Sequence, residues 1–372
     1  MRNPSMARTS MLLALALSST TVALAAPSPA NLDARLSALS RSAPEAYAAA
    51  RDALVADRSL DDATLSARVA GATFSDESWR ADAMALVVAA RRQDPRAFEA
   101  VRAPKGLDPA IYLQNRRAIP LAGRELSHAE IHPAVLVESA LFPRAARVES
   151  PMPAHVDRAR AGTLRRQEAR AFKDAIFMAL AASRHASAAP VLLEVGLHAA
   201  DAVDRGAALA LVGSLAADAR VEPALVSVVE DLGAPEDARV GAIVGLGKVR
   251  STRATSLLAA VASLDENLAA RRSAVGALGN AGNRTAHRFA PSKDSDAVRS
   301  LVEDALVDVV LHSTDDVSRE MTVQALGVSG NAATHARLVA LASTTKDARA
   351  HELLSQTARV LAKGLARDRS DR

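Results

Sequence analysis

The chain has 372 residues, only 2% of them aromatic, and a formal net charge of +4 at pH 7. It contains no cysteine, which excludes disulfides, a lipid-modified cysteine anchor and a cysteine nucleophile. Residues 166–372 contain 25 Lys and Arg against 25 Asp and Glu. Nucleic-acid binders that lack a basic patch generally need aromatic stacking platforms, so we set nucleic acid aside as a partner.

The N-terminus has the pattern of a secretory signal peptide. Arg2 and Arg8 precede an apolar run from Met11 to Leu17, and small residues occupy the two positions that a signal peptidase reads before the expected cleavage after Ala25. No later stretch is long and apolar enough to span a bilayer. The pattern predicts a signal peptide over residues 1–25 and an exported chain, periplasmic or extracellular, without an integral membrane segment after cleavage.

Residues 26–102 are expected to form an irregular helical N-terminal region. Arg80, Met84 and Val87 match three of the four positions of a sequence pattern, called the phrase below, that recurs between residues 166 and 363. The fourth fails, because Val88 stands where the phrase has a very small residue. One divergent helical hairpin over about 77–101 is therefore one interpretation, with Phe98 and Val101 on its second helix.

Residues 103–165 read as an irregular connection, because prolines collect there and the periodicity weakens. A short helix is expected over Pro133 to Leu141. The connection also contains a metal-like cluster, His128, Glu130 and His132, which a helix would place at ligand spacing.

Two features of this cluster argue against a metal site. Its glutamate does not directly follow the first histidine, as it does in the zinc-protease motif. Pro133 also opposes an uninterrupted helix through both histidines. We interpret the segment as a polar loop and assign no cofactor, with a metal-dependent enzyme or accessory factor using His128, Glu130 and His132 as the alternative.

A four-part phrase recurs between residues 166 and 363. A basic residue is followed by an aliphatic or aromatic residue four positions later, an aliphatic at seven and a very small residue at eight. Its copies begin at Lys173, Arg205, Arg239, Arg271 and Arg319, spaced by 32, 34, 32 and 48 residues. Self-similarity at this period predicts a solenoid of repeated helical hairpins, each too small to bury its apolar face alone.

Offsets of four and seven place apolar side chains on one stripe of a first helix. A second helix carries its own pairs: Leu192 and Val195, Leu225 and Val228, Leu258 and Val261, Leu306 and Val309, and Leu338 and Leu341. Turns such as Gly282-Asn283 and Gly330-Asn331 are expected to end helices with a positive φ. The glycines at the eighth position predict close approach between helices, since a helix-interior glycine needs a packing reason.

Two segments, Asp237 through Gly247 and Asp316 through Gly327, resemble HEAT repeats, and more closely the short bacterial type also found in phycobilisome-lyase-like proteins. The resemblance covers residues 166–363. It implies an α-α superhelix and a role in protein binding, although some relatives assist enzymatic reactions. The last unit departs from the pattern, with Gln356 and Thr357 where Leu and Gly are expected, and we interpret it as a terminal cap. Residues 364–372 form a charged tail.

The repeated arginines have two interpretations, a phosphate-gripping stripe or a set of ties between neighbouring repeats. We favour the ties, because an acidic residue stands near each helix start, where it can cap free N–H groups: Asp204, Asp237, Asp316 and Asp347. Each arginine would then bridge to a carboxylate or carbonyl of the neighbouring repeat.

The unit between Arg271 and Arg319 holds an insertion near 283–298, which contains Arg284, His287, Arg288, Phe289 and Lys293. Insertions in solenoids form loops along one face and often mark the binding face, so we predict that these five residues contact a partner, with a tolerated surface insertion as the alternative. The sequence thus predicts a non-enzymatic exported scaffold that binds a protein or peptide, or serves as a structural spacer. It assigns no catalytic residue.

Overall fold

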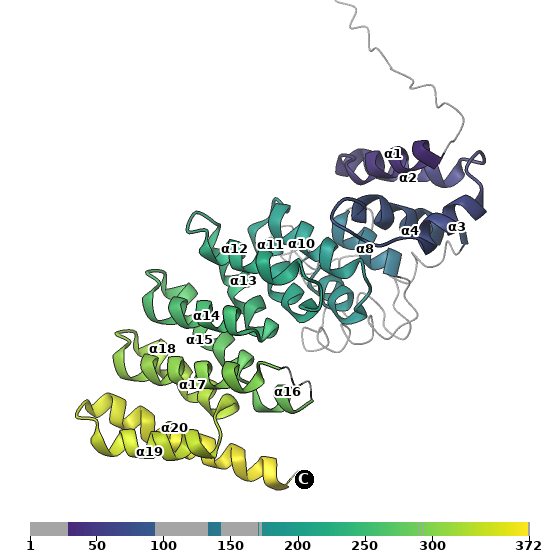
Figure 1. The fold of residues 1–372 in the computed structure, drawn as a ribbon. Helices are drawn as coiled ribbons and strands as arrows, with labels where there is room; N and C mark the ends of the chain where they lie inside the picture. Colours follow the sequence, from purple (N-terminus) through teal and green to yellow (C-terminus); the bar gives the residue numbers. More distant parts are fainter. Residues whose placement is uncertain are drawn as a thin grey trace, which may run out of the picture.

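The computed structural model describes residues 29–93, 133–142 and 170–370, apart from 171, 172, 290 and 292. Within these ranges it has 16 α-helices with complete bounds, a further helical segment at residues 173–183 and no β-strand, which confirms the predicted all-α class (Figure 1). None of the helices in these ranges combines the length and apolar character needed to cross a membrane. The predicted signal peptide and the cluster of His128, Glu130 and His132 lie outside the described residues.

Four helices precede the first gap: α1 (Pro29–Ser40), α2 (Pro44–Ala56), α3 (Asp62–Ala70) and α4 (Trp79–Gln93). α2 starts with a proline, whose missing N–H is not needed in a first turn. The Asp61 side chain caps α3 by accepting from the Thr64 amide. α4 contacts the other three helices, and its Met84, Val87 and Val88 are fully buried. Val88 therefore belongs to the core even though the repeat phrase fails at that position.

α8 (Pro133–Leu141) confirms the short helix expected at these residues. It packs against α4 on one side and against α10 (Ala188–His198) on the other. α8 therefore connects the N-terminal helices to the repeat region. The second helix expected to carry Phe98 and Val101 lies outside the described residues.

The repeat region forms two layers of helices. The first helices of the units are residues 173–183, α11 (Ala202–Val212), α13 (Glu236–Val249), α15 (Leu268–Ala281), α18 (Asp316–Ser329) and α20 (Ala348–Ser370). The second helices are α10, α12 (Val221–Glu230), α14 (Thr252–Leu264), α17 (Ser295–His312) and α19 (Ala332–Thr344). From α11 to α20, each first helix packs beside the first helix of the next unit, so the hairpins stack in chain order (Figure 1). The 3-10 turn η2 (Gly213–Leu215) follows α11.

The predicted apolar stripes form the core between the layers. The leading leucine of every predicted second-helix pair is completely buried: Leu192, Leu225, Leu258, Leu306 and Leu338. On the first helices, Leu209, Ile243, Leu278 and Leu326 are likewise 0% exposed. The register of the phrase is therefore correct in each unit, including the one that contains the insertion.

The eighth-position glycines lie where first helices meet. A Cβ at Gly247 would be 2.7 Å from the Ala277 carbonyl oxygen of the next first helix, and one at Gly279 would be 3.0 Å from Ala325 Cα. At Gly213 the clash would be with the backbone of Gly245. The predicted close approach of helices is confirmed.

The expectation of positive φ in two turns is wrong. Gly282 has φ −86° and Gly330 has φ −64°. Gly282 is required for space instead, because a Cβ there would lie 2.8 Å from both Ser329 and Val302 side-chain atoms. A positive φ occurs at Arg250, the C-cap of α13, where no sequence signal indicated it.

The long unit and the last unit depart from the common hairpin. The insertion forms the short helix α16 (Arg284–Phe289) and lengthens the second helix, since α17 has 18 residues where α14 has 13. In α20, Thr357 is completely buried and its hydroxyl donates to the Leu353 carbonyl oxygen at 2.6 Å. α20 is the last helix of the first-helix layer, in line with the predicted cap.

Candidate functional site

Three of the five repeated basic residues, Lys173, Arg239 and Arg319, bind an acidic residue of the next unit, as the favoured interpretation predicted. Arg239, at the start of α13, donates from Nε to the Val229 carbonyl oxygen of the preceding second helix at 2.9 Å. Its two terminal nitrogens donate to both carboxylate oxygens of Asp265, which precedes the next first helix. Both side chains are nearly buried, at 10% and 8% exposed. One guanidinium therefore joins three successive helices.

The same arrangement recurs along the stack. Arg319 donates from Nε to the Val310 carbonyl oxygen at 2.9 Å and from Nη2 to Asp347 at 3.1 Å. At the N-terminal end of the stack, Lys173 Nζ donates to Asp204 at 2.6 Å. These basic groups are engaged within the protein, which argues against a phosphate-binding stripe.

One tie uses a residue that sequence reasoning missed. In the unit with the insertion, Arg272 rather than Arg271 reaches the next first helix, donating to the two Asp315 carboxylate oxygens at 3.0 and 2.8 Å. These hydrogen bonds hold the pKa of Asp315 well below its usual value. The two arginines are adjacent in sequence, and only the packing of α15 against α18 selects between them.

The capping roles assigned from sequence are correct at Asp347 alone. Asp347 accepts from the Arg349 and Ala350 amides. Asp201 caps α11, so Asp204 lies about one turn too far along that helix to act as its N-cap. Asp315 caps α18, so Asp316 lies one residue too far along. Asp237 is also wrong, because the N-cap of α13 is Pro235, which has no side-chain cap.

Two of the five predicted partner-binding residues hold the insertion in place. Arg284 Nη1 donates to the Gly327 and Gly330 carbonyl oxygens at 2.8 and 2.7 Å, which ties α16 to the end of α18. His287 is 7% exposed, with Nε2 2.6 Å from the Ala281 carbonyl oxygen and Nδ1 3.0 Å from the Ser295 hydroxyl. Because a carbonyl only accepts, His287 carries its proton on Nε2 and accepts at Nδ1. Burial lowers the pKa of His287, and the nearby charges of Arg250 and Arg299 lower it further.

Two more of the five predicted residues lie on the surface of the insertion. Arg288 and Lys293 are exposed, on either side of the turn between α16 and α17. The side chain of Phe289 lies outside the described part of the chain. The structure therefore divides the five residues into two that stabilise the insertion and two basic ones on its surface.

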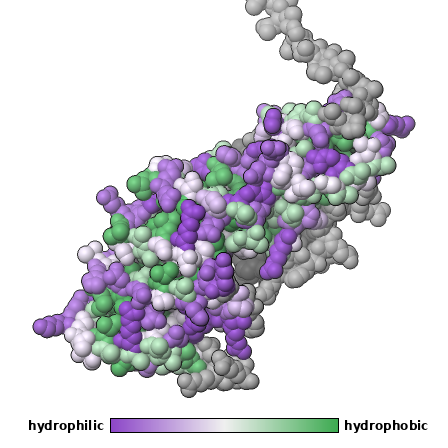
Figure 2. All heavy atoms as spheres, in the orientation of Figure 1, coloured by the Kyte–Doolittle hydropathy of each residue, from purple (hydrophilic) through white to green (hydrophobic). Residues whose placement is uncertain are grey.

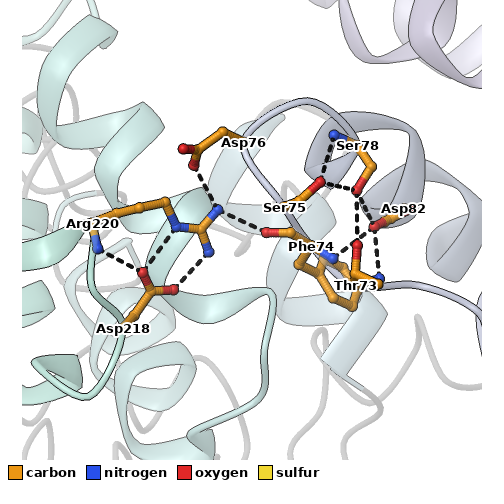
Figure 3. Close-up of polar contacts among 8 residues, drawn as sticks. All are labelled: Thr73, Phe74, Ser75, Asp76, Ser78, Asp82, Asp218 and Arg220. Atoms are coloured by element: carbon orange, nitrogen blue, oxygen red, sulfur yellow. Dashed lines mark hydrogen bonds and ion pairs between the residues drawn. The ribbon is translucent and has the colours of Figure 1, made fainter.

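A second polar cluster joins the N-terminal helices to the repeat region, and sequence reasoning missed it (Figure 3). Asp82 is in the first turn of α4, and one of its oxygens binds the turn before the helix. That oxygen accepts from the Thr73 and Phe74 amides at 3.2 and 2.7 Å and from the Ser78 hydroxyl at 2.9 Å. These bonds hold the turn that contains Phe74 at φ 51°. The carbonyl of Phe74 is thereby presented to the repeat region.

Arg220, at the start of α12, receives this turn. Its Nη1 donates to the Phe74 carbonyl oxygen at 2.7 Å and to Asp76 at 3.1 Å, while Asp218 accepts from Nη2 at 2.6 Å (Figure 3). A further ion pair, Arg80 to Glu194 at 2.7 Å, joins α4 to α10. The N-terminal helices therefore dock against the start of the stack. No local signal could have indicated these contacts, because Arg220 and Asp76 are 144 positions apart.

A buried carboxylate, Glu138 on α8, links three helices. Tyr47 Oη donates to its Oε1 at 3.0 Å, Arg51 Nη1 to the same oxygen at 2.6 Å, and Arg91 Nη2 to Oε2 at 3.2 Å. The Tyr47 ring stacks on Phe142 with centroids 3.6 Å apart. Burial raises the pKa of Tyr47 well above its usual value, and the charge of Glu138 adds to this. With both oxygens of Glu138 bound by donors of the protein, the arrangement fits a structural role.

Among the described residues, no group of three His, Cys, Asp or Glu side chains is placed to hold a metal ion. The alternative site at His128, Glu130 and His132 falls in the gap between 93 and 133, so it stays a prediction. No protein-family model matches this chain, and no curated protein matches its sequence.

Proposed function

We propose that this protein is an exported, non-enzymatic scaffold of HEAT-like repeats that binds a protein or peptide partner through the surface of its helical stack and needs no cofactor. The observation that carries the proposal is the recurrent tie, in which a basic residue of one unit binds the acidic residue before or at the start of the next first helix. Ties of this kind fix the spacing of successive hairpins. A stack with fixed spacing presents a long, preorganised surface, which lowers the cost of binding an extended partner.

The binding region that we propose from the sequence is the insertion. Arg288 and Lys293 are its exposed members, while Arg284 and His287 anchor it. An anchored insertion with an outward basic surface suits an acidic segment of a partner, because rim charges of opposite sign steer association.

This proposal is tested by substitution rather than by deletion, because deletion would remove the anchoring bonds of Arg284. The full chain and an Arg288→Glu/Lys293→Glu variant are used to capture partners from the envelope fraction of the source cells. Arg359→Glu/Lys363→Glu, which makes the same charge change at exposed positions of α20, is the matched control. We expect a specific protein that is retained by the control and lost with the insertion variant. Retention of no partner by the unaltered chain would contradict the scaffold proposal.

Export and the metal alternative have their own tests. For export, N-terminal sequencing of the protein recovered outside the cytoplasm should begin at Ala26. For the alternative of a metal-dependent enzyme or accessory factor, metal analysis of the purified chain at neutral pH decides. Stoichiometric metal that is lost on His128→Ala/His132→Ala substitution would favour that alternative over the scaffold.

A further inference from the structure

Two leucines in the stack are almost fully exposed at equivalent positions. Leu232 is 82% exposed and Leu264 is 80% exposed. Each lies seven residues before a repeat arginine, Arg239 or Arg271. Leu232 is in the turn after α12, and Leu264 is the last residue of α14. More partly exposed apolar residues lie at the same kind of turn: Leu197, Val203, Leu268 and Val317.

These turns lie along one side of the stack. In Figure 1 they follow one another at the left, on the opposite side from α16 and the C-terminus. Figure 2 shows hydrophobic surface alternating with hydrophilic surface along this side. We name this surface the acidic edge and define it by the turns 197–204, 230–237, 264–268, 312–317 and 345–347.

The acidic edge carries more acidic than basic residues. Its five turns contain eleven Asp and Glu residues and one Lys. Five of the carboxylates are paired with Lys or Arg residues just outside the turns, namely Asp204, Asp265, Asp315, Asp316 and Asp347. The other six make no ion pair within the described residues. Some of these carboxylates cap first helices or bind tie arginines, as Asp201 and Asp265 do. Exposed Glu230 and Glu266 do neither, and within the described residues their side chains make no hydrogen bond or ion pair.

The position of Glu230 is unfavourable for the fold. It is the last residue of α12, where a negative charge opposes the helix dipole. Exposed apolar surface that is rimmed by polar residues is typical of an interaction site.

The geometry of the edge fits a helix. Adjacent packed helices lie about 8–10 Å apart, so equivalent residues of successive units are separated by roughly that distance. Seven residues of an α-helix advance about 10.5 Å. A helix laid along the edge would therefore place apolar side chains at i and i+7 against Leu232 and Leu264, with its basic residues beside Glu230 and Glu266.

We infer that the acidic edge docks a basic amphipathic helix of a partner protein, with Leu232 and Leu264 as its apolar anchors. This inference rests on the proposed scaffold function but assigns a different side of the stack from the insertion. The occupant is basic because the edge is acidic, and amphipathic because its two most exposed side chains are leucines.

The test uses a fluorescent synthetic peptide of three heptads of Leu and Lys with its leucines on one helix face, and a scrambled peptide of the same composition without that face. Binding to the full chain is measured by anisotropy at about 0.15 M salt. We expect the amphipathic peptide to bind about tenfold more tightly than the scrambled one. Leu232→Ser/Leu264→Ser and Glu230→Lys/Glu266→Lys should each weaken its binding about tenfold.

Val328→Ser/Val339→Ser is the matched control, because these valines are also partly exposed but lie outside the five turns. It should keep the affinity within about twofold, and circular dichroism verifies that all variants are folded. Equal binding of the two peptides, or unchanged affinity in the leucine variant, would overturn the inference. An oligomer in sedimentation that the leucine variant converts to a monomer would also overturn it, in favour of a second copy as occupant.

Failure of the inference is distinguishable from failure of the proposed function. If the leucine variant still captures the cellular partner, only the acidic edge is refuted as its site. If the unaltered chain captures nothing, the scaffold proposal itself fails.

Discussion

The tie between Arg239 and Asp265 gives the sharpest test of how the stack is held together. Arg239→Met keeps an unbranched side chain but removes every hydrogen bond of the guanidinium. Asp265, whose side chain is 8% exposed, is then left as a nearly buried charge without its main partner. Removing one partner of a buried ion pair costs about 3–5 kcal/mol, because the remaining charge keeps its desolvation penalty.

Arg319→Met is the matched comparison. Arg319 makes the same bond to a second-helix carbonyl and is equally buried, but its partner Asp347 is 51% exposed. A hydrogen bond from a charged group is worth about 1.5–3 kcal/mol. A solvated ion pair adds only about 0–1 kcal/mol. Both variants lose the bond to a carbonyl, so the difference comes from the ion pairs. We therefore expect Arg239→Met to reduce the free energy of unfolding by about 2–5 kcal/mol more than Arg319→Met.

The assay is urea unfolding followed by circular dichroism, with hydrogen exchange to locate the change to α13 and α15. The double variant Arg239→Met/Asp265→Asn should recover at least about 1 kcal/mol relative to Arg239→Met, because the uncompensated charge is gone. Equal effects of Arg239→Met and Arg319→Met, or no recovery in the double variant, would refute the argument that burial of the partner sets the cost.

The same tie predicts a dependence on pH. Burial alone would raise the pKa of Asp265, but hydrogen bonds from Arg239 and the Asn267 amide bring it below its usual value. A carboxyl group with a lowered pKa stabilises the folded state above its unfolded pKa of about 4, and the contribution disappears as the pH falls below that value. The difference in unfolding free energy between wild type and Arg239→Met should therefore shrink in acid, and a difference independent of pH would contradict this.

Three more predictions follow from the packing. Gly247→Ala should lower the free energy of unfolding in urea by about 1–3 kcal/mol, because the added Cβ meets the Ala277 carbonyl oxygen. Gly276→Ala, where the nearest neighbour of the added Cβ is 4.0 Å away, should raise it by about 0.5–1 kcal/mol. The reverse order would refute the close-approach argument. Because the pKa of His287 is lowered, the unfolding free energy should be fully retained above about pH 6.5 and decrease below it, and His287→Gln should show a flatter profile between about pH 7 and 5. Arg220→Ala should increase hydrogen exchange in the turn before α4 and leave exchange in α15 to α19 unchanged. If exchange in that turn is the same in the variant and the wild type, the junction does not depend on Arg220.

Much of the stack was predictable because its physics is local. A stripe at offsets of four and seven must face the core on any helix, and Leu209, Ile243 and Leu326 are buried as the phrase requires. The position of the insertion was predictable for the same reason, since a change in spacing shows where residues were added. Glycines at a repeated place predicted close helix contacts, which Gly247 and Gly279 make.

The candidate site was predictable only in outline. The insertion containing Arg284 to Lys293 was found, but the sequence did not show that Arg284 and His287 are used internally. That outcome depends on carbonyl oxygens at Gly327, Gly330 and Ala281, which are presented by helix ends and leave no signature in residue type. The sequence also did not predict that the leucines of the acidic edge are exposed, since a leucine near a helix end is expected to be in the core until the packing is known.

The sequence by itself determined the all-α class, the repeat register and the side chains that fill the core, because helical periodicity fixes which residues share a face before any tertiary contact exists. Tertiary structure alone decided that Arg272 replaces Arg271 in a tie, that α8 packs on α4, and that Arg220 joins the N-terminal helices to the stack. These contacts join residues far apart in the chain, and each depends on the position of a backbone that the whole fold sets. The final positions of the polar side chains therefore depended on packing that no local pattern records.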